Sequence, residues 1–265
     1  MRHLFFIVAL VFGLSGGLSA QVSDLLRKAA DGDSEAMLKL SEKYLFGFGV
    51  DQSDDSSRYW LQQALATGDP EAQYLVGLQY TGMARDAAQF DEGMELMEKA
   101  AEQDHKESLV RLSEIYRERN TSTESDRYYN LRKSFHCATR AGELGHREAM
   151  AYAAECKLAG KGTEQNDSLG VAWMEKAASN GRFFPAMLRM GELRLAGVAL
   201  SQPDPFGALA YFRAVMAHDR ANVDQKSQAR IGIHEVDKVL RQWQNVMFDA
   251  GSFLPHDAFQ YEIRE

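Results

Sequence analysis

Apolar residues recur along the chain with the spacing of one helical face, and this pattern itself repeats. Tyr44, Tyr80 and Tyr116 lie 36 residues apart. A turn residue precedes each repeat, at Gly32, Gly68, Asp104, Gly145 and Gly181. After each turn, an apolar position is followed directly by a small residue, as in the pairs Leu40-Ser41, Val76-Gly77, Leu112-Ser113, Ala153-Ala154 and Met190-Gly191. This spacing predicts a first helix whose small residue lets a neighbouring helix approach closely.

A second helix is expected in each repeat. Its large apolar position is occupied by Trp60, Leu96, Cys137, Trp173 and Phe212. Four residues later stand Ala64, Ala100, Ala141, Ala177 and Met216, which share the same face. Glycines in the loops 47–56 and 159–168 supply left-handed backbone and end the first helix. Extra residues in the third and fifth repeats are expected in the loops between paired helices.

The chain resembles the Sel1-like repeat family, a relative of tetratricopeptide arrays. The resemblance lies in the pattern A-x-x-x-[LVM]-[GSA]-x-x-Y, in the G-x-G loops of repeats one and four, and in the later Trp and Ala. The resemblance implies an all-α fold, an α/α superhelical solenoid of about five helix-turn-helix repeats that serves as a protein-binding scaffold. The expected repeats are residues 29–64, 65–100, 101–141, 142–177 and 178–220 of a solenoid spanning 21–248. Solenoids need covered ends. Ser23 is expected to cap a short helix at one end, and residues 223–248 form a capping helix at the other.

The N-terminus has a different character. Arg2 precedes the apolar run Leu4–Leu14, and small residues lead to Ala20. This predicts a signal peptide over residues 1–20, cleaved after Ala20, because the run is shorter than the ~20 apolar residues that span a bilayer. No stable membrane anchor is expected after cleavage, and the mature chain is expected in the periplasm or outside the cell. The tail 249–265 has no assigned role.

Composition narrows the classes of function. Apolar residues make up 45% and charged residues 26% of the chain, which is typical of a folded protein. The net charge of −8 disfavours nucleic acid as a partner. The histidines lack metal-ligand spacing, and the only G-x-S-x-G lies in the signal segment. We therefore expect no catalytic residues, no metal and no cofactor. His105 and His146 are interpreted as helix-start residues.

Two cysteines allow one intramolecular disulfide. Cys137 and Cys156 lie on helices expected to be antiparallel neighbours. An exported protein can oxidise them. The alternative is a buried free thiol at Cys137 with a peripheral Cys156, and the sequence leaves both open.

The residues that the repeat leaves free indicate where a partner binds. If the array resembles tetratricopeptide arrays, the position after each small residue points into a concave face. Acidic residues fill it at Glu42, Glu114, Glu155 and Glu192, and Tyr74 belongs to a neighbouring apolar strip. We expect these residues to receive a basic or extended segment of another protein. The alternative is an ordinary solvated helix face.

The sequence thus favours an exported, non-enzymatic scaffold for protein–protein interaction. One rival is a β-lactam-binding or β-lactam-hydrolysing enzyme, an activity linked to some members of the family, although no S-x-x-K motif is present. Another is a module that binds cell wall or carbohydrate through Trp and Tyr. Trp60 and Trp173 are interpreted instead as core residues.

Overall fold

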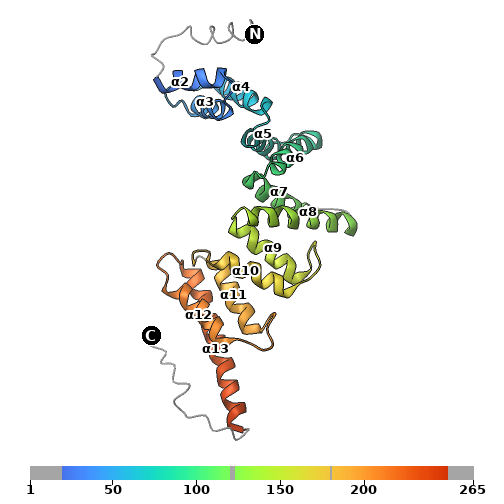
Figure 1. The fold of residues 1–265 in the computed structure, drawn as a ribbon, viewed down its shortest axis with the longest axis vertical. Coiled ribbons are helices and arrows are strands. Elements are labelled where there is room, and N and C mark those ends of the chain that lie inside the picture. Colours follow the sequence, from blue (N-terminus) through green and yellow to red (C-terminus); the bar gives the residue numbers. More distant parts are fainter. Residues whose placement is uncertain (1–19, 120–122, 180, 250–265) are drawn as a thin grey trace. The chain divides into compact units, whose positions relative to one another are not determined.

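The computed structural model describes residues 20–119, 123–179 and 181–249, and these form an all-helical fold (Figure 1). The described helices are α2 (Ala20–Ala30), α3 (Ser34–Phe46), α4 (Asp54–Ala66), α5 (Pro70–Gly82), α6 (Ala87–Glu102), α7 (Lys106–Glu118), α8 (Glu124–Glu143), α9 (Arg147–Ala159), α10 (Asp167–Ala178), α11 (Phe184–Ala196), α12 (Pro205–Ala217) and α13 (Val223–Asp249). The chain divides into two compact units, one ending at Ser108 and the other beginning at Leu109. The predicted signal segment before Ala20 and the tail after Asp249 lie outside the described residues.

The turns between repeats lie at the predicted residues. All five turn residues have positive φ, with values of 92° at Gly32, 80° at Gly68, 59° at Asp104, 91° at Gly145 and 62° at Gly181. Glycine reaches this region without the steric cost that a side chain imposes. The chain therefore reverses at the same point of every repeat, as the spacing predicts.

Two of the first helices, α5 and α9, show the side-chain caps clearly. Asp69 precedes α5, accepts a hydrogen bond from the Ala72 amide and is followed by Pro70 in the first turn, as predicted. His146 caps α9 in the same way, since its Nδ1 accepts from the Ala149 amide at 3.2 Å. The interpretation of His146 as a helix-start residue is confirmed.

Small residues stand where the two helices of a repeat cross. Gly77 of α5 faces Gly93 of α6 so closely that a Cβ on Gly93 would lie 2.8 Å from the Gly77 oxygen. The corresponding pairs in other repeats are Ser41 with Ser57, Ser113 with Ser134, and Ala154 with Gly170. The small residue of the first helix was predicted. Its partner on the second helix was not, although it always precedes the large apolar position by three residues.

Each unit has its own core. In the N-terminal unit, buried side chains of α2, α3, α4 and α5 pack together, including Val22, Leu40 and Tyr44. In the C-terminal unit, Phe212, Met174 and Met190 belong to a larger cluster that α13 covers with Ala229 and Val236. The end helices therefore bury apolar faces of the terminal repeats, as a solenoid requires.

The start of α2 differs from the prediction. It begins at Ala20, so Ser23 lies inside the helix and does not cap it. The additional turn is stabilised by packing, because Val22 is fully buried and lies on the same face as Leu25.

The insertion in the third repeat also differs from the prediction. Most of its residues belong to α8, which has 20 residues, whereas the equivalent α4 has 13. Thr123 caps the extension by accepting from the Asp126 amide, and Glu124 and Asp126 lie favourably against the helix dipole. The added segment therefore lengthens a helix and not a loop.

In the fifth repeat, one buried position of the second helix, α12, differs from the predicted one. Phe212 is buried as predicted, but Met216 is only half-buried and Val215 is fully buried in its place. Spacings of three and four residues both keep side chains on one face of a helix, so the sequence pattern did not distinguish them.

Candidate functional site

The predicted row of glutamates lies on the first helices of the repeats, and its members in the C-terminal unit have arginine partners. Glu114 of α7 pairs with Arg111 at 3.2 Å. Arg189 of α11 binds Glu155 of α9 at 2.6 Å and Glu192 of its own helix at 2.8 Å. Two arginines therefore offset part of the negative charge of these three glutamates.

Arg189 links two neighbouring repeats. Its Nε and Nη2 both donate to the Glu155 carboxylate, and its Nη1 donates to Glu192. The hydrogen bond to Glu155 raises the pKa of Arg189 above its ordinary value, and the bond to Glu192 adds to this effect. The sequence did not reveal the arrangement because the two partners are 34 residues apart.

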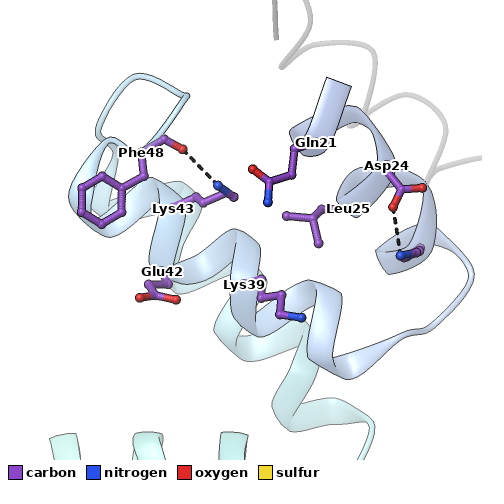
Figure 2. A pocket seen from close by; sticks show the side chains of 8 residues that line it. Gln21, Asp24, Leu25, Lys39, Glu42, Lys43 and Phe48 are labelled. Carbon is purple, nitrogen blue, oxygen red and sulfur yellow. Dashed lines mark hydrogen bonds and ion pairs between the residues drawn. The ribbon is translucent and has the colours of Figure 1, made fainter. Parts of the chain in front are cut away.

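Glu42 lies in the N-terminal unit and has a different setting. It lines an open hollow of about 340 Å³ between α2 and α3, shown in Figure 2. The other lining residues are Gln21, Asp24, Leu25, Lys28, Lys39, Lys43 and Phe48. Charges of both signs surround the hollow, and Phe48 at its rim is 58% exposed. The chemistry of the lining suits contact with a peptide better than it suits one small charged ligand.

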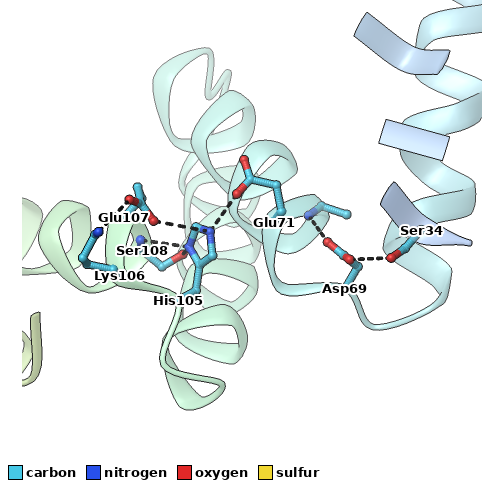
Figure 3. Close-up of polar contacts among 8 residues, drawn as sticks. Ser34, Asp69, Glu71, His105, Lys106, Glu107 and Ser108 are labelled. Atoms are coloured by element: carbon cyan, nitrogen blue, oxygen red, sulfur yellow. Dashed lines mark hydrogen bonds and ion pairs between the residues drawn. The ribbon is translucent and has the colours of Figure 1, made fainter. Parts of the chain in front are cut away.

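Tyr74 packs beside a polar junction of the N-terminal unit, whose residues at the starts of α3, α5 and α7 are shown in Figure 3. The Tyr74 ring lies 5.0 Å from the ring of His105, measured between centroids. His105 Nδ1 accepts from the Ser108 amide, and its Nε2 therefore carries the proton that is donated to Glu71 at 2.9 Å. His105 thus starts a helix, as predicted.

Figure 3 also shows that Ser34 donates to Asp69, which joins the starts of α3 and α5. These contacts link the turns of successive repeats. They leave the polar groups of the junction occupied by one another, so the junction has a structural role.

The cysteines are both free and both buried. The disulfide is not formed in the structure, and Cys156 is not peripheral, because it is 1% exposed. Burial raises the pKa of the Cys156 thiol and raises that of the neighbouring Tyr152 to about 12. Neither group is primed for nucleophilic chemistry near neutral pH.

Trp60 and Trp173 pack against the hydrophobic cores of their units, in agreement with the sequence interpretation, but each side chain is only half-buried. Trp173 stacks on Phe135 of α8 with 6.1 Å between centroids and 17° between planes. Neighbouring second helices therefore meet through rings whose outer parts remain accessible.

The described residues contain neither a metal-binding cluster nor a membrane-spanning helix. Among them, no group of three or more His, Cys, Asp or Glu side chains is arranged to hold a metal ion. None of the helices within the described ranges is both long enough and apolar enough to cross a membrane.

Comparison with known proteins gives a consistent result. The family model for the Sel1 repeat matches five segments, residues 34–69, 70–105, 108–146, 147–181 and 185–214, which together make up more than half of the chain. Among solved structures, a Sel1 repeat protein from Oxalobacter formigenes is similar with a TM-score of 0.60 and 21% identity. The match covers 72% of this chain and 76% of that one.

A second solved structure and a curated protein are also similar. A protective antigen of uropathogenic Escherichia coli strains has a TM-score of 0.44 and 19% identity over 93% of this chain and 62% of its own. An F-box protein of Arabidopsis thaliana is 30% identical over 168 residues, which are 63% of this chain. The chain spans only 42% of the length of that curated relative.

Proposed function

Because the chain belongs to the Sel1 repeat family, we propose that it is a non-catalytic scaffold that binds another protein. The proposal is based on the charged side chains that the repeat pattern does not use for packing. Charged groups such as Glu155, Arg189 and Glu192 lie exposed or half-buried on the first helices of two successive repeats and pair with one another. They do not converge on a reacting atom, whereas a catalytic site needs groups that do.

A preformed surface of this kind is suited to protein recognition. The side chains are held on helices, so a partner would bind with little loss of conformational freedom in the scaffold. The partner surface would include Glu42 and Tyr74 in the N-terminal unit. In the C-terminal unit it would include Glu114, Glu155 and Glu192, with the paired arginines providing donors beside the carboxylates.

We also propose that the protein is exported and acts in the periplasm. The support is the apolar run Leu4–Leu14 and the small residues before Gln21. Cleavage after Ala20 would leave the buried residues Val22 and Leu25 of α2 in the mature chain. The first repeat would therefore keep its covering helix.

Affinity capture tests the scaffold proposal. The mature chain is immobilised and incubated with an envelope fraction, and bound proteins are identified by mass spectrometry. We expect reproducible enrichment of a specific protein in an amount comparable to the scaffold. Turnover of a β-lactam by the purified chain would support the enzyme alternative and contradict the proposal.

Export is tested separately by cell fractionation and intact-mass measurement. We expect the protein in the osmotic-shock fraction, with a mass that corresponds to a chain beginning at Gln21. Full-length protein in the cytoplasmic fraction would contradict export while leaving the scaffold proposal in place.

A further inference from the structure

One exposed face of α8 combines aromatic and cationic side chains. Tyr128, Arg132 and Phe135 follow one another at spacings of four and three residues, which places them on the same side of the helix. Tyr128 is 53% exposed, Arg132 is exposed and Phe135 is half-buried. Tyr128 stands in the helical extension that the other second helices lack.

Helix α9 and the loop that follows it each add one lysine to this face. At Gly162 the loop rests directly on α8, since a Cβ there would lie 2.3 Å from the Leu131 oxygen and 2.7 Å from the Arg132 nitrogen. Only glycine fits such an approach. The contact places Lys161, the preceding residue of the loop, beside this turn of α8.

Lys157 is held over the same surface. Its Nζ donates to Thr163 Oγ1 at 2.7 Å and lies 5.3 Å from the centre of the Phe135 ring. The other neighbour of that ring is Trp173, stacked at 6.1 Å. We call the resulting set the α8 surface, and it consists of Tyr128, Arg132, Phe135, Lys157, Lys161 and Trp173.

The cations of the α8 surface have no acidic partners among the residues that the structure describes. Arg132, Lys157 and Lys161 form none of the ion pairs found there, whereas the cations Arg111, Arg189 and Arg194 of the same unit are paired. Glu164 lies in the same loop and Glu124 lies four residues before Tyr128 on α8, so three cations face two acids and an excess of positive charge remains. Such an excess is unusual in a chain whose net charge is −8.

We propose that the α8 surface binds an acidic, extended segment of a partner protein. This rests on the proposed scaffold function and specifies its partner. Carboxylates of the segment would pair with Arg132, Lys157 and Lys161, and its apolar side chains would pack on Tyr128 and Trp173. Aromatic residues and arginine are the types that dominate binding energy at protein interfaces. Nucleic acid is disfavoured, because three cations on an acidic protein provide a small footprint for a polyanion.

The test uses a short fluorescein-labelled peptide in which glutamate alternates with leucine, and binding is followed by anisotropy. We expect the mature chain to bind this peptide. A control peptide with glutamine in place of every glutamate should give no change in anisotropy. The triple variant R132Q/K157Q/K161Q should bind about tenfold more weakly, the sum expected of three exposed ion pairs. The single variant Lys161→Glu, in an exposed loop position, should also weaken binding and does not depend on packing.

The control is R213Q/R230Q/R241Q, which changes the net charge equally by removing three exposed arginines of α12 and α13. It should bind the peptide as the unmodified chain does. The proposal would be overturned if both triple variants weakened peptide binding equally, or if the unmodified chain did not bind the peptide. It would also be overturned if the unmodified chain bound single-stranded DNA or a sugar polymer more tightly than the peptide. Affinity capture of a partner that is unchanged by R132Q/K157Q/K161Q would refute the α8 surface and leave the scaffold function intact.

Discussion

At the scale of single residues, backbone conformation decides several local stabilities. Among the described residues other than glycine, Asp104 and Ala199 have positive φ, at 59° and 57°. Alanine is strained there because its Cβ crowds the following carbonyl, whereas aspartate tolerates the region better. A substitution by glycine should therefore raise the free energy of unfolding more at Ala199 than at Asp104.

We predict that Ala199→Gly raises the free energy of unfolding by about 0.5–1 kcal/mol, and that Asp104→Gly raises it less. The greater freedom that glycine gives the unfolded chain offsets part of the relief in both cases. Urea denaturation followed by circular dichroism measures the change. A loss of stability in Ala199→Gly would contradict the strain at this position.

Asp204 joins a helix cap to an ion pair. It accepts from the Gly207 amide and lies 2.9 Å from Arg194. The backbone hydrogen bond, followed by Arg194, lowers the pKa of Asp204 below its ordinary 3.8. A group whose pKa is lowered by folding contributes stability above its unfolded pKa and loses that contribution as the pH falls through the folded value.

We predict that Asp204→Ala costs about 1 kcal/mol at neutral pH, because the cap and the pair are both lost. Asp204→Asn should cost less, since asparagine caps helices as well as aspartate does. The difference between the unmodified chain and each variant should shrink toward about pH 3, where the unfolded carboxyl is protonated. Urea midpoints at both pH values measure this, and a cost that does not depend on pH would rule out the ionised carboxylate as its source.

At the scale of elements, the crossing of paired helices depends on side-chain size. Gly77 and Gly93 bring α5 and α6 together, and a Cβ at Gly93 would lie 2.8 Å from the Gly77 oxygen and 2.9 Å from the Thr81 nitrogen. Neither atom belongs to the end of a flexible side chain. The helices would have to move apart to accept a larger residue.

We predict that Gly93→Ala destabilises the N-terminal unit by about 1–3 kcal/mol despite the better helix propensity of alanine. Gly82→Ala is the matched control, because Gly82 ends α5 with no atom within 4 Å of its would-be Cβ. That change should be neutral or stabilising. Thermal unfolding of both variants distinguishes close packing at the crossing from helix propensity as the cause. Equal changes in melting temperature would show that close packing at Gly93 does not determine the stability.

Local patterns predicted the helices well, because turn residues and the i, i+4 positions act over a few residues. Asp69, His146 and the five turn residues were predicted and are confirmed. The lengthened α8 was not predicted, since a polar segment with a capping threonine reads as either loop or helix. Val215 was missed in favour of Met216 because spacings of three and four are equivalent on a helix.

At the scale of the whole chain, the contacts between repeats could not be predicted from the sequence, and these contacts determine the surroundings of the candidate site residues. The glutamates were recognisable from their periodic positions, but their ion-pair partners were not, and the partner of Glu155 comes from the next repeat. Arg189 neutralises Glu155 across 34 residues, and Gly162 brings Lys161 to α8 through backbone contact. Such pairings follow from tertiary geometry, which a repeat pattern does not encode.

The end helix α2 gives a prediction at this scale. Val22 is fully buried, and Leu25 and Ala29 are nearly so. A chain of residues 21–265 should therefore be as stable as the full chain. Removing residues 1–30 should cost several kcal/mol, since about 1.5–3 kcal/mol accompanies the burial of each large apolar side chain. Calorimetry of the two truncated chains measures the loss, and equal melting temperatures would show that α2 does not cover the first repeat.

The most direct test of the scaffold account is titration of the mature chain with the protein that it captures. Isothermal titration calorimetry of the two purified proteins should give a saturable complex of fixed stoichiometry. R132Q/K157Q/K161Q should weaken that complex, and R213Q/R230Q/R241Q should leave it unchanged. Failure of the unmodified chain to form a saturable complex with any captured protein would contradict the central claim that this repeat array is a protein-binding scaffold.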